Sequence, residues 1–392
     1  MSSGRKFAHA KVSNSLCGAM LGVLTASNAF NRIVGPLFGK DDFPPEILVS
    51  LLDYSSTITE EPAELAELVI PQATLIGCGA VGGAFVYALS LLPAVSGKLG
   101  IVDPDWVTST NVHRYVLARP IDLVNRVYKT QRARELLSHH AKLKVSEYRK
   151  NFSAFLDEDC DDRKIPFLIS AVDSYGKRRD LGRETPYEAL NASTGSFALA
   201  LSTHYRAYLN EGPCLGCHYP ASDAEQERFA VIAREIGLQI GEVQKLSNTN
   251  APMTSDLLAR IATFRRQPPD TYSEFFGQPF DSLYQHGICG GIKVETQSGL
   301  TEIPLAHISA SAGILLAIET LKRFSPKLEQ YALDNFLQLD LLNLTSCWFS
   351  DRKPARPGCD CRKEIYRRRF ERKYEALSAP LFTNAATNAT RL

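Results

Sequence analysis

The sequence predicts an α/β fold in which a mainly parallel, Rossmann-like sheet carries helices on both faces. Between residues 73 and 103, an apolar strand leads into a glycine-rich turn, an apolar helix and a second strand that ends in an acidic residue. Shorter apolar strands then alternate with helical segments up to residue 172. This alternation is typical of parallel sheets that are built from strand–helix–strand units.

Changes in this pattern divide the chain into five predicted segments. They are a helical N-terminal extension (1–70), a core (71–221), a charge-rich helical insertion (222–290), a C-terminal part of the core (291–375) and a flexible polar tail (376–392). The sheet is expected to resume at Gly291–Thr296. Residues 22–32 also resemble residues 313–323, so the extension is either the remnant of a second copy of the core or similar to it by chance.

Composition limits the classes of function. Of the 392 residues, 44% are hydrophobic and 22% are charged, and the formal net charge is +1. A chain so close to neutral has no bulk attraction to nucleic acid or to an anionic membrane, and it contains no apolar run of spanning length. Nine cysteines in a long chain with a nucleotide-type turn indicate thiols or metal ligands in a reducing compartment. We therefore expect a cytoplasmic protein that binds neither nucleic acid nor membrane.

The glycine-rich turn predicts a nucleotide site. Gly77, Gly79 and Gly82 follow the first strand and precede a helix, where backbone N–H groups and the helix dipole favour an anion. Asp103 ends the second strand, where an acidic side chain binds a ribose diol. A dehydrogenase that uses NAD has these features too, so the turn alone does not define the chemistry.

Four further residues favour ATP over NAD. Three polar or basic residues follow the second strand: Asn111, Arg114 and Lys129. Together they are interpreted as side chains that bind reacting phosphates. Asp173 follows another apolar strand, where its carboxylate is suited to Mg²⁺ beside those phosphates. An NAD-dependent dehydrogenase leaves this set unexplained.

Two close cysteine pairs predict a zinc site. Cys214 and Cys217 form a CxxC sequence, and Cys359 and Cys361 form a CxC sequence. Two thiolate pairs brought together provide the tetrahedral S₄ coordination that suits Zn²⁺. The alternatives are a redox-active CxxC and two unrelated pairs of surface thiols.

These motifs resemble those of ThiF-type enzymes, which adenylate sulfur-carrier and ubiquitin-like proteins. The resemblance is carried by LIGCGAVGG, IVDPDWVTSTNVHRYV, VYKTQRARE and SAVDSYGKRRDL. It implies that residues 71–221 are a nucleotide-binding adenylation core, with Asp103 on the ribose, Asn111, Arg114 and Lys129 on the phosphates and Asp173 on Mg²⁺. Arg178 matches a recurrent arginine of the family, and Arg32 is the nearest equivalent of an arginine that the family takes from a partner subunit.

The resemblance also implies a reaction. The chain is most like a prokaryotic activating enzyme that adenylates the C-terminal carboxylate of a ubiquitin-like protein, as a homodimer or heterodimer. Arg114 and Asp173 would act in catalysis, and Cys289, in the glycine-flanked sequence HGICGG, would then form a thioester for a conjugating enzyme. A sulfur-carrier adenylyltransferase without a thioester step and an NAD-dependent dehydrogenase remain alternatives.

Overall fold

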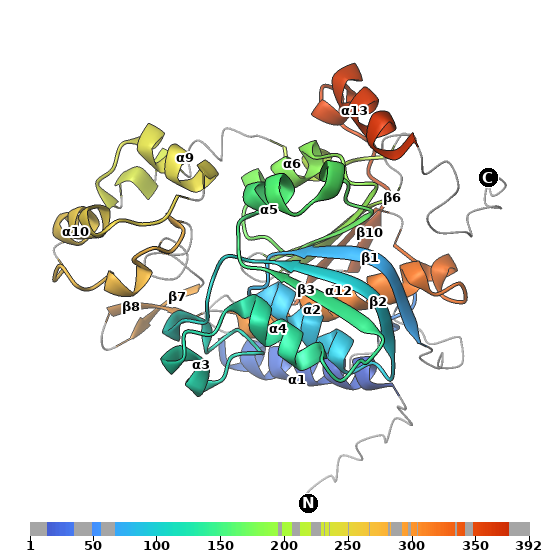
Figure 1. The fold of residues 1–392 in the computed structure, drawn as a ribbon. Coiled ribbons are helices and arrows are strands. Elements are labelled where there is room, and N and C mark those ends of the chain that lie inside the picture. The colour runs from blue at the N-terminus through green and yellow to red at the C-terminus, as the bar shows by residue number, and fades with distance from the viewer. Residues whose placement is uncertain are drawn as a thin grey trace, which may run out of the picture.

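An eight-stranded sheet, with strand order β10-β9-β6-β5-β4-β1-β2-β3, forms the centre of the protein (Figure 1). The strands are β1 (Leu68–Ile76), β2 (Val95–Val102), β3 (Leu143–Tyr148), β4 (Phe167–Ser170), β5 (Glu188–Thr194), β6 (Ala198–Tyr205), β9 (Phe336–Asp340) and β10 (Trp348–Asp351). The five strands from β5 to β3 are parallel, and β6, β9 and β10 are antiparallel to their neighbours. The predicted α/β fold with a mainly parallel sheet is therefore confirmed.

This computed structural model describes most, but not all, of the 392 residues. The described ranges are 14–34, 49–55, 67–194, 198–205, 212–220, 229–249, 251–283, 292–296, 299–303, 305–341 and 348–375, without 231, 235, 266, 281, 282 and 334. Among these residues, no helix combines the length and the apolar character needed to cross a membrane.

The register of the central strands places three loops at one edge of the sheet. Ile76 at the end of β1 pairs with Val102 of β2 on one side and with Ser170 of β4 on the other. The chain segments that begin at Gly77, Asp103 and Ala171 therefore leave the sheet next to one another. Ligands of open α/β sheets bind at this carboxyl edge of the strands.

Helices cover both faces of the sheet. One face carries α1 (Ser15–Val34), α2 (Ala80–Ser90), α4 (Lys129–Leu137) and α12 (Ala306–Phe324), while α5 (Phe152–Glu158), α6 (Tyr175–Arg183) and α13 (Glu364–Tyr374) lie on the other side (Figure 1). The contact between α2 and α12 is close, because a Cβ atom at Gly313 would lie 2.4 Å from the carbonyl oxygen of Val81. Small residues in α12 thus let it press against the helix that follows the glycine-rich turn.

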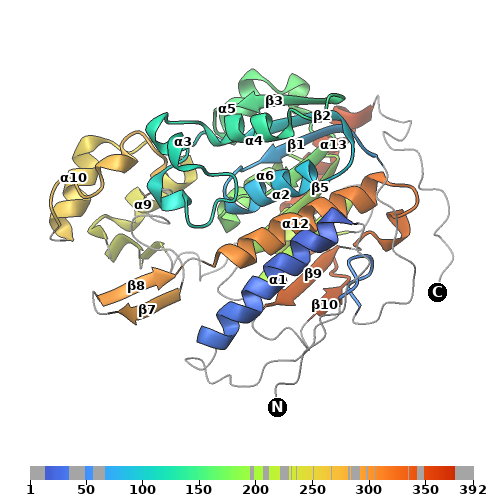
Figure 2. The same ribbon diagram turned by 90° about the horizontal axis from the view of Figure 1, so that it is seen from below.

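The N-terminal helix α1 packs beside α12 (Figure 2). Leu16 and Met20 of α1 are buried in the main core, and the Asn31 side chain donates a hydrogen bond to the carbonyl of Leu341 at 2.6 Å. The first strand begins at Leu68, earlier than the strand predicted from residue 73, because Leu68 and Ile70 are buried and pair with β2 ahead of an irregularity at Pro71 and Gln72, where the register shifts. The division of the chain into five domains stays a prediction.

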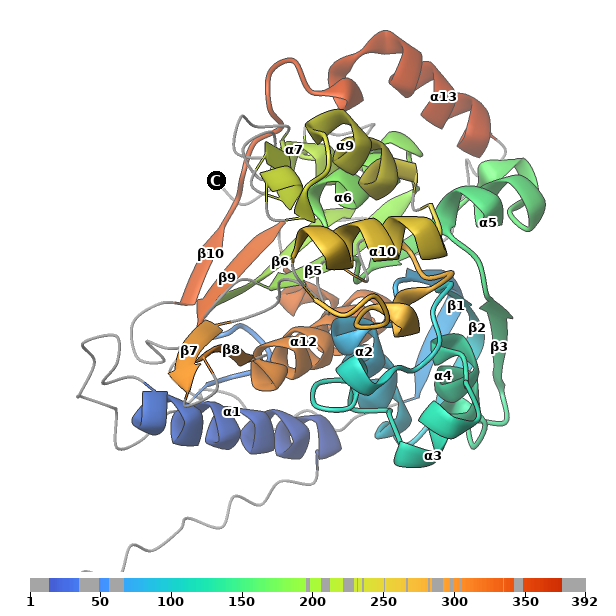
Figure 3. The same cartoon turned by 90° about the vertical axis from the view of Figure 1, so that its left-hand side faces the viewer.

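The insertion forms a helical unit with its own hydrophobic core. It contains α9 (Ile240–Thr249) and α10 (Ser255–Phe264), and its buried cluster shares no residue with the core beneath the sheet. The Ser109 hydroxyl contacts the carboxylate of Glu274 at 2.8 Å, which ties the insertion to the loop after β2. The unit lies at the carboxyl edge of the sheet (Figure 3).

The prediction that the sheet resumes at Gly291–Thr296 was wrong. Strand β7 (Ile292–Thr296) pairs with β8 (Gly299–Ile303) in a separate two-stranded sheet. A pattern of alternating residues identifies a strand but not its partner, and this short strand pairs locally with the strand that follows it.

Candidate nucleotide and metal sites

The glycine-rich turn lies between β1 and α2. Gly77 has φ +89°, a conformation that side chains other than glycine rarely adopt. A Cβ atom at Gly82 would lie 2.1 Å from the carbonyl oxygen of Gly77, so only glycine fits there. The turn is therefore tight, and it leaves backbone N–H groups at the start of α2 open to an anion.

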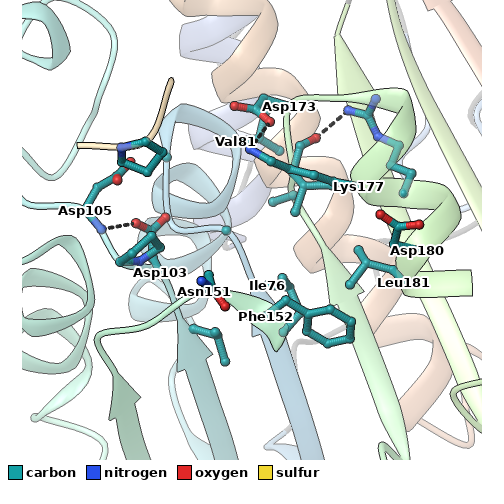
Figure 4. A pocket seen from close by; sticks show the side chains of 18 of the residues that line it. Ile76, Val81, Asp103, Asp105, Asn151, Phe152, Asp173, Lys177, Asp180 and Leu181 are labelled. Atoms are coloured by element: carbon teal, nitrogen blue, oxygen red, sulfur yellow. Dashed lines mark hydrogen bonds and ion pairs between the residues drawn. The ribbon is translucent and has the colours of Figure 1, made fainter. Parts of the chain in front are cut away.

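Asp103 is buried directly after β2. Its carboxylate accepts hydrogen bonds from the backbone N–H of Cys78 at 2.6 Å and of Asp105 at 2.9 Å (Figure 4). Burial raises the pKa of Asp103, and the nearby ammonium of Lys129 opposes that rise. The aspartate thus fixes the glycine-rich turn against its own loop while its oxygens border the cavity.

Lys129 is the first residue of α4 and pairs with Asp105, the second acid of the Asp-Pro-Asp sequence. The two charged groups are 2.7 Å apart, and their side chains are 6% and 18% exposed. Burial tends to lower the pKa of Lys129, but Asp105 and Asp103 outweigh it and raise the pKa above its usual range. Lys129 is therefore a fixed positive charge at the cavity wall.

Asn111 and Arg114 come from the loop after β2. The Asn111 side chain accepts a hydrogen bond from the backbone N–H of Thr108 at 3.0 Å and closes a short 3₁₀ turn, Ser109–Asn111. Arg114 is half-buried, and both residues line the same cavity as the glycine-rich turn. The structure thus gathers the predicted phosphate-binding residues around one space.

Asp173 lies on the far side of this cavity, between β4 and α6. Its side chain is 42% exposed, and Oδ1 is 3.1 Å from the amino group of Lys177 (Figure 4). Carboxylate oxygens are the donor type that Mg²⁺ prefers. The residue therefore fits the role of a magnesium ligand.

The cavity has a volume of about 850 Å³, which is near the upper end of small-molecule sites, about 300–1,000 Å³. Its base has an apolar part formed by Ile76, Phe152 and Leu181, with Asn151 beside it (Figure 4). Asn151 and Phe152 were not predicted as site residues, although they closely follow β3, whose carboxyl end lies at the same edge of the sheet.

The helical insertion also borders the cavity, which the sequence analysis did not predict. Ser247, Asn248 and Thr249 at the end of α9, together with Pro279, form part of the wall. Ser309 in the first turn of α12 contributes to the same wall. The space is thus enclosed by the sheet edge on one side and by polar side chains of the insertion on the other.

The four paired cysteines come together in one cluster. Cys214 Sγ is 3.9 Å from Cys217 Sγ and 3.6 Å from Cys359 Sγ, and Cys217 Sγ is 3.6 Å from Cys361 Sγ. Disulfides require about 2.05 Å, whereas a tetrahedral Zn–S₄ site with bonds of about 2.3 Å has edges of about 3.8 Å. The sulfur positions therefore fit a zinc ion, and two unrelated surface pairs are excluded.

Cys289 and Arg32 were also singled out from the sequence. Cys289 lies outside the described residues, so its place relative to the nucleotide site stays a prediction. Arg32 is exposed in the last turn of α1 and is not among the residues that line the cavity. Arg178 does line it, and its guanidinium bonds to the carbonyl of Val172.

The fold and site together define an α/β protein in which a glycine-rich turn, basic residues and Asp173 border one cavity, and in which four cysteines form a cluster. A family model described as the ThiF family matches residues 60–363, so the chain belongs to the ThiF family. The family resemblance drawn from the sequence motifs is therefore confirmed.

The individual proteins to which the chain is similar share less than a third of its residues. The chain is 29% identical over 383 residues to the uncharacterized protein y4jF of Sinorhizobium fredii, across 92% of this chain and 70% of that protein. Among solved structures, it is similar to E. coli MccB with ATP (14% identity, TM-score 0.42) and with MccA (14% identity, TM-score 0.44). These alignments cover 74% of this chain and 65% and 66% of the MccB chains, just under two thirds of each.

Proposed function

We propose that this ThiF family protein uses ATP and Mg²⁺ to adenylate the C-terminal carboxylate of a ubiquitin-like or sulfur-carrier protein. One observation carries the proposal: Asp103, Arg114, Lys129 and Asp173 border a single cavity with the glycine-rich turn. A dinucleotide site needs the turn and Asp103, but it has no use for the basic clamp or for Asp173 across from it.

The cavity offers a distinct place for each part of the nucleotide. The apolar surface of Ile76, Phe152 and Leu181 suits a base, and Asp103 suits the ribose. The N–H groups of the turn, with Arg114 and Lys129, suit the phosphates. The remaining wall, from α9 and the first turn of α12, leaves room for the substrate carboxylate.

In the proposed reaction, a carboxylate oxygen of the substrate attacks the α-phosphorus of ATP. The bond between that phosphorus and the bridging oxygen to the β-phosphate breaks, and pyrophosphate leaves with the bond's electron pair. Arg114 and Lys129 stabilise the charge that develops on the phosphate oxygens. Mg²⁺, held by Asp173, would neutralise charge on the departing pyrophosphate.

The cysteine cluster is proposed to hold one Zn²⁺ with a structural role. Four thiolates leave no coordination position for a substrate, which is typical of structural zinc. The N–H of Arg356 also contacts Cys217 Sγ at 3.3 Å, a second layer of support for the sulfur ligands.

The later steps are proposed from the sequence alone. Cys289 would attack the acyl-adenylate, release AMP and form a thioester, which a conjugating enzyme collects. Without that step the protein is a sulfur-carrier adenylyltransferase. In either case we propose a homodimer or heterodimer in the cytoplasm.

Exchange of labelled pyrophosphate into ATP tests the proposal. Carrier proteins encoded by neighbouring genes should support exchange, and the same carriers with an amidated C-terminus should not, because the carboxylate is then blocked. NAD binding without any response to ATP would contradict it and favour the dehydrogenase alternative.

A further inference from the structure

Helix α6 lies between the cavity and the cysteine cluster. Asp173, just before the helix, lines the cavity, and so do residues along the helix as far as Arg183. Near the C-terminal end of α6, a Cβ atom on Gly182 would lie 3.1 Å from the backbone nitrogen of Gly216, between the two cysteines of the CxxC sequence. Helix α6 therefore packs directly on the turn that holds half of the cluster.

The second cysteine pair contacts the same end of α6. Asp360 stands between Cys359 and Cys361, and its carboxylate lies 2.8 Å from Nε of Arg183, the last residue of the helix. Both cysteine pairs thus contact the C-terminal part of α6, and the loop that contains Asp173 leads into the N-terminus of the same helix.

Tyr219 makes a second connection between cluster and cavity. It follows Cys217 by two residues, is buried, and lies with its ring 4.8 Å from the guanidinium carbon of Arg178. Arg178 donates a hydrogen bond to the carbonyl of Val172, the residue before Asp173. The ring therefore supports the side chain that fixes the backbone beside the proposed magnesium ligand.

The hydroxyl of Tyr219 also contacts Ser193, a residue that lines the cavity. It accepts a hydrogen bond from Nδ2 of Asn191 at 2.8 Å and contacts Oγ of Ser193 at 2.9 Å. The side-chain oxygen Oδ1 of Asn191 accepts a hydrogen bond from the hydroxyl of Ser170 at 2.7 Å. Ser193 lines the cavity, so the network runs from the CxxC turn to the nucleotide site.

We infer that Tyr219 and α6 couple the cysteine cluster to Asp173, so that zinc binding and Mg·ATP binding strengthen each other. The inference rests on the proposed function, because it requires Asp173 to hold magnesium and the cluster to hold zinc. Coupling between two sites is reciprocal: an ordered cluster favours the position of Asp173 that binds Mg·ATP, and bound Mg·ATP retains the zinc. Tyr219 is a positioning residue here, since it acts through Arg178 and Ser193.

The first test measures zinc release from the unmodified protein into a chromogenic chelator. Saturating Mg·ATP should slow release at least about fivefold, and ATP without added magnesium should slow it much less. Calorimetry on the same sample reports whether Mg·ATP binds. If it binds and release does not change, the coupling is overturned while the proposed function stands. If it does not bind, both fail.

The second test compares Tyr219→Phe with Tyr374→Phe. Tyr374 is also buried and packs in the cluster that contains Cys214, Cys217 and Cys361, but its hydroxyl bonds to the backbone of Ile165 and it does not line the cavity. Tyr219→Phe removes the hydroxyl that anchors the ring to Asn191 and Ser193, so the ring is held less firmly beside Arg178. The magnesium concentration for half-maximal ATP binding should therefore rise by at least about fivefold. The substitution should leave the affinity for magnesium-free ATP unchanged.

Tyr374→Phe should leave both quantities at the values of the unmodified protein. Equal losses of magnesium-free and magnesium-bound ATP affinity in Tyr219→Phe would indicate a general structural defect and overturn the inference. The same magnesium shift in Tyr374→Phe would overturn it too. Release of zinc from Asp173→Asn should no longer respond to magnesium in the presence of ATP.

Discussion

The amino group of Lys129 lies 2.7 Å from Oδ2 of Asp105, and both side chains are largely buried at the cavity wall. The lysine was predicted to bind phosphates, and the structure shows which residue positions it. Asp103, two residues earlier, uses its oxygens to hold the N–H groups of Cys78 and Asp105. The two acids of the Asp-Pro-Asp sequence therefore have different roles. Asp103 stabilises the glycine-rich turn, and Asp105 positions the amino group of Lys129.

Asp105→Asn should lower the free energy of unfolding by about 3 kcal/mol, because Lys129 would remain buried without its closest counter-charge. Urea denaturation of both proteins measures the difference. The matched control is Asp162→Asn, since Asp162 pairs with Lys164 at 2.9 Å in an exposed position. The control should change stability by less than about 0.5 kcal/mol. An equally small effect in Asp105→Asn would show that the pair does not stabilise the fold.

Purified protein should contain about one equivalent of zinc, as a closed four-thiolate site requires. Cys361→Ser should lose the metal and lower the thermal midpoint by about 10 °C or more, because metal-binding free energy is part of the folding free energy of such sites. Cys160→Ser is the control, since Cys160 lies outside the cluster and bonds to the carbonyl of Lys164. Full stability after complete zinc removal would rule out a structural zinc.

Gly313→Ala should destabilise the protein by about 3 kcal/mol, the upper end for overpacked cores. The new Cβ would lie 2.4 Å from the Val81 carbonyl oxygen and 2.5 Å from Ala84 Cβ, so α2 and α12 must separate. Gly22→Ala is the control, because nothing lies within 4 Å of its Cβ in α1. It should stabilise α1 by about 0.5–1 kcal/mol. A neutral Gly313→Ala would mean that the two helices can move apart freely.

Local sequence predicted the parts of the site that follow strands of the sheet. The order of apolar strand, glycine turn and apolar helix identified β1 and α2, and acids at strand ends identified Asp103 and Asp173. These features depend on short-range patterns, because the end of the preceding strand determines where each of these residues lies at the sheet edge. The two cysteine pairs were equally visible, because zinc ligands come in close pairs.

Long-range placement could not be predicted in the same way. Nothing in the sequence around Lys129 shows that Asp105 is its partner, and nothing in α9 shows that Ser247 borders the cavity. Each contact depends on how an insertion or crossover returns to the sheet edge. The pairing of β7 with β8 was not predicted for the same reason, because an alternating pattern identifies a strand but not the strand it pairs with.

Asp173→Ala and Arg114→Ala should each abolish the binding of Mg·ATP measured by calorimetry, because one removes the proposed magnesium ligand and the other a phosphate contact. Asp173→Ala should keep weak binding of magnesium-free ATP, since the glycine-rich turn and Asp103 are intact. NAD should not bind to any of these proteins. Tight NAD binding with no response to ATP would support the dehydrogenase alternative instead.

Cys289→Ala separates adenylation from thioester formation. Pyrophosphate exchange with the carrier should persist, because adenylation uses only the nucleotide cavity, and the reducible carrier–enzyme adduct on non-reducing gels should disappear. Asp173→Ala should lose both, since no adenylate forms for a thiolate to attack. Cys160→Ser is the matched control: its thiol is half-buried, and burial raises its pKa to about 11, so it is a weak nucleophile at neutral pH. An adduct that survives Cys289→Ala would assign the chemistry to another cysteine, and an unmodified protein that never forms one would be a simple adenylyltransferase.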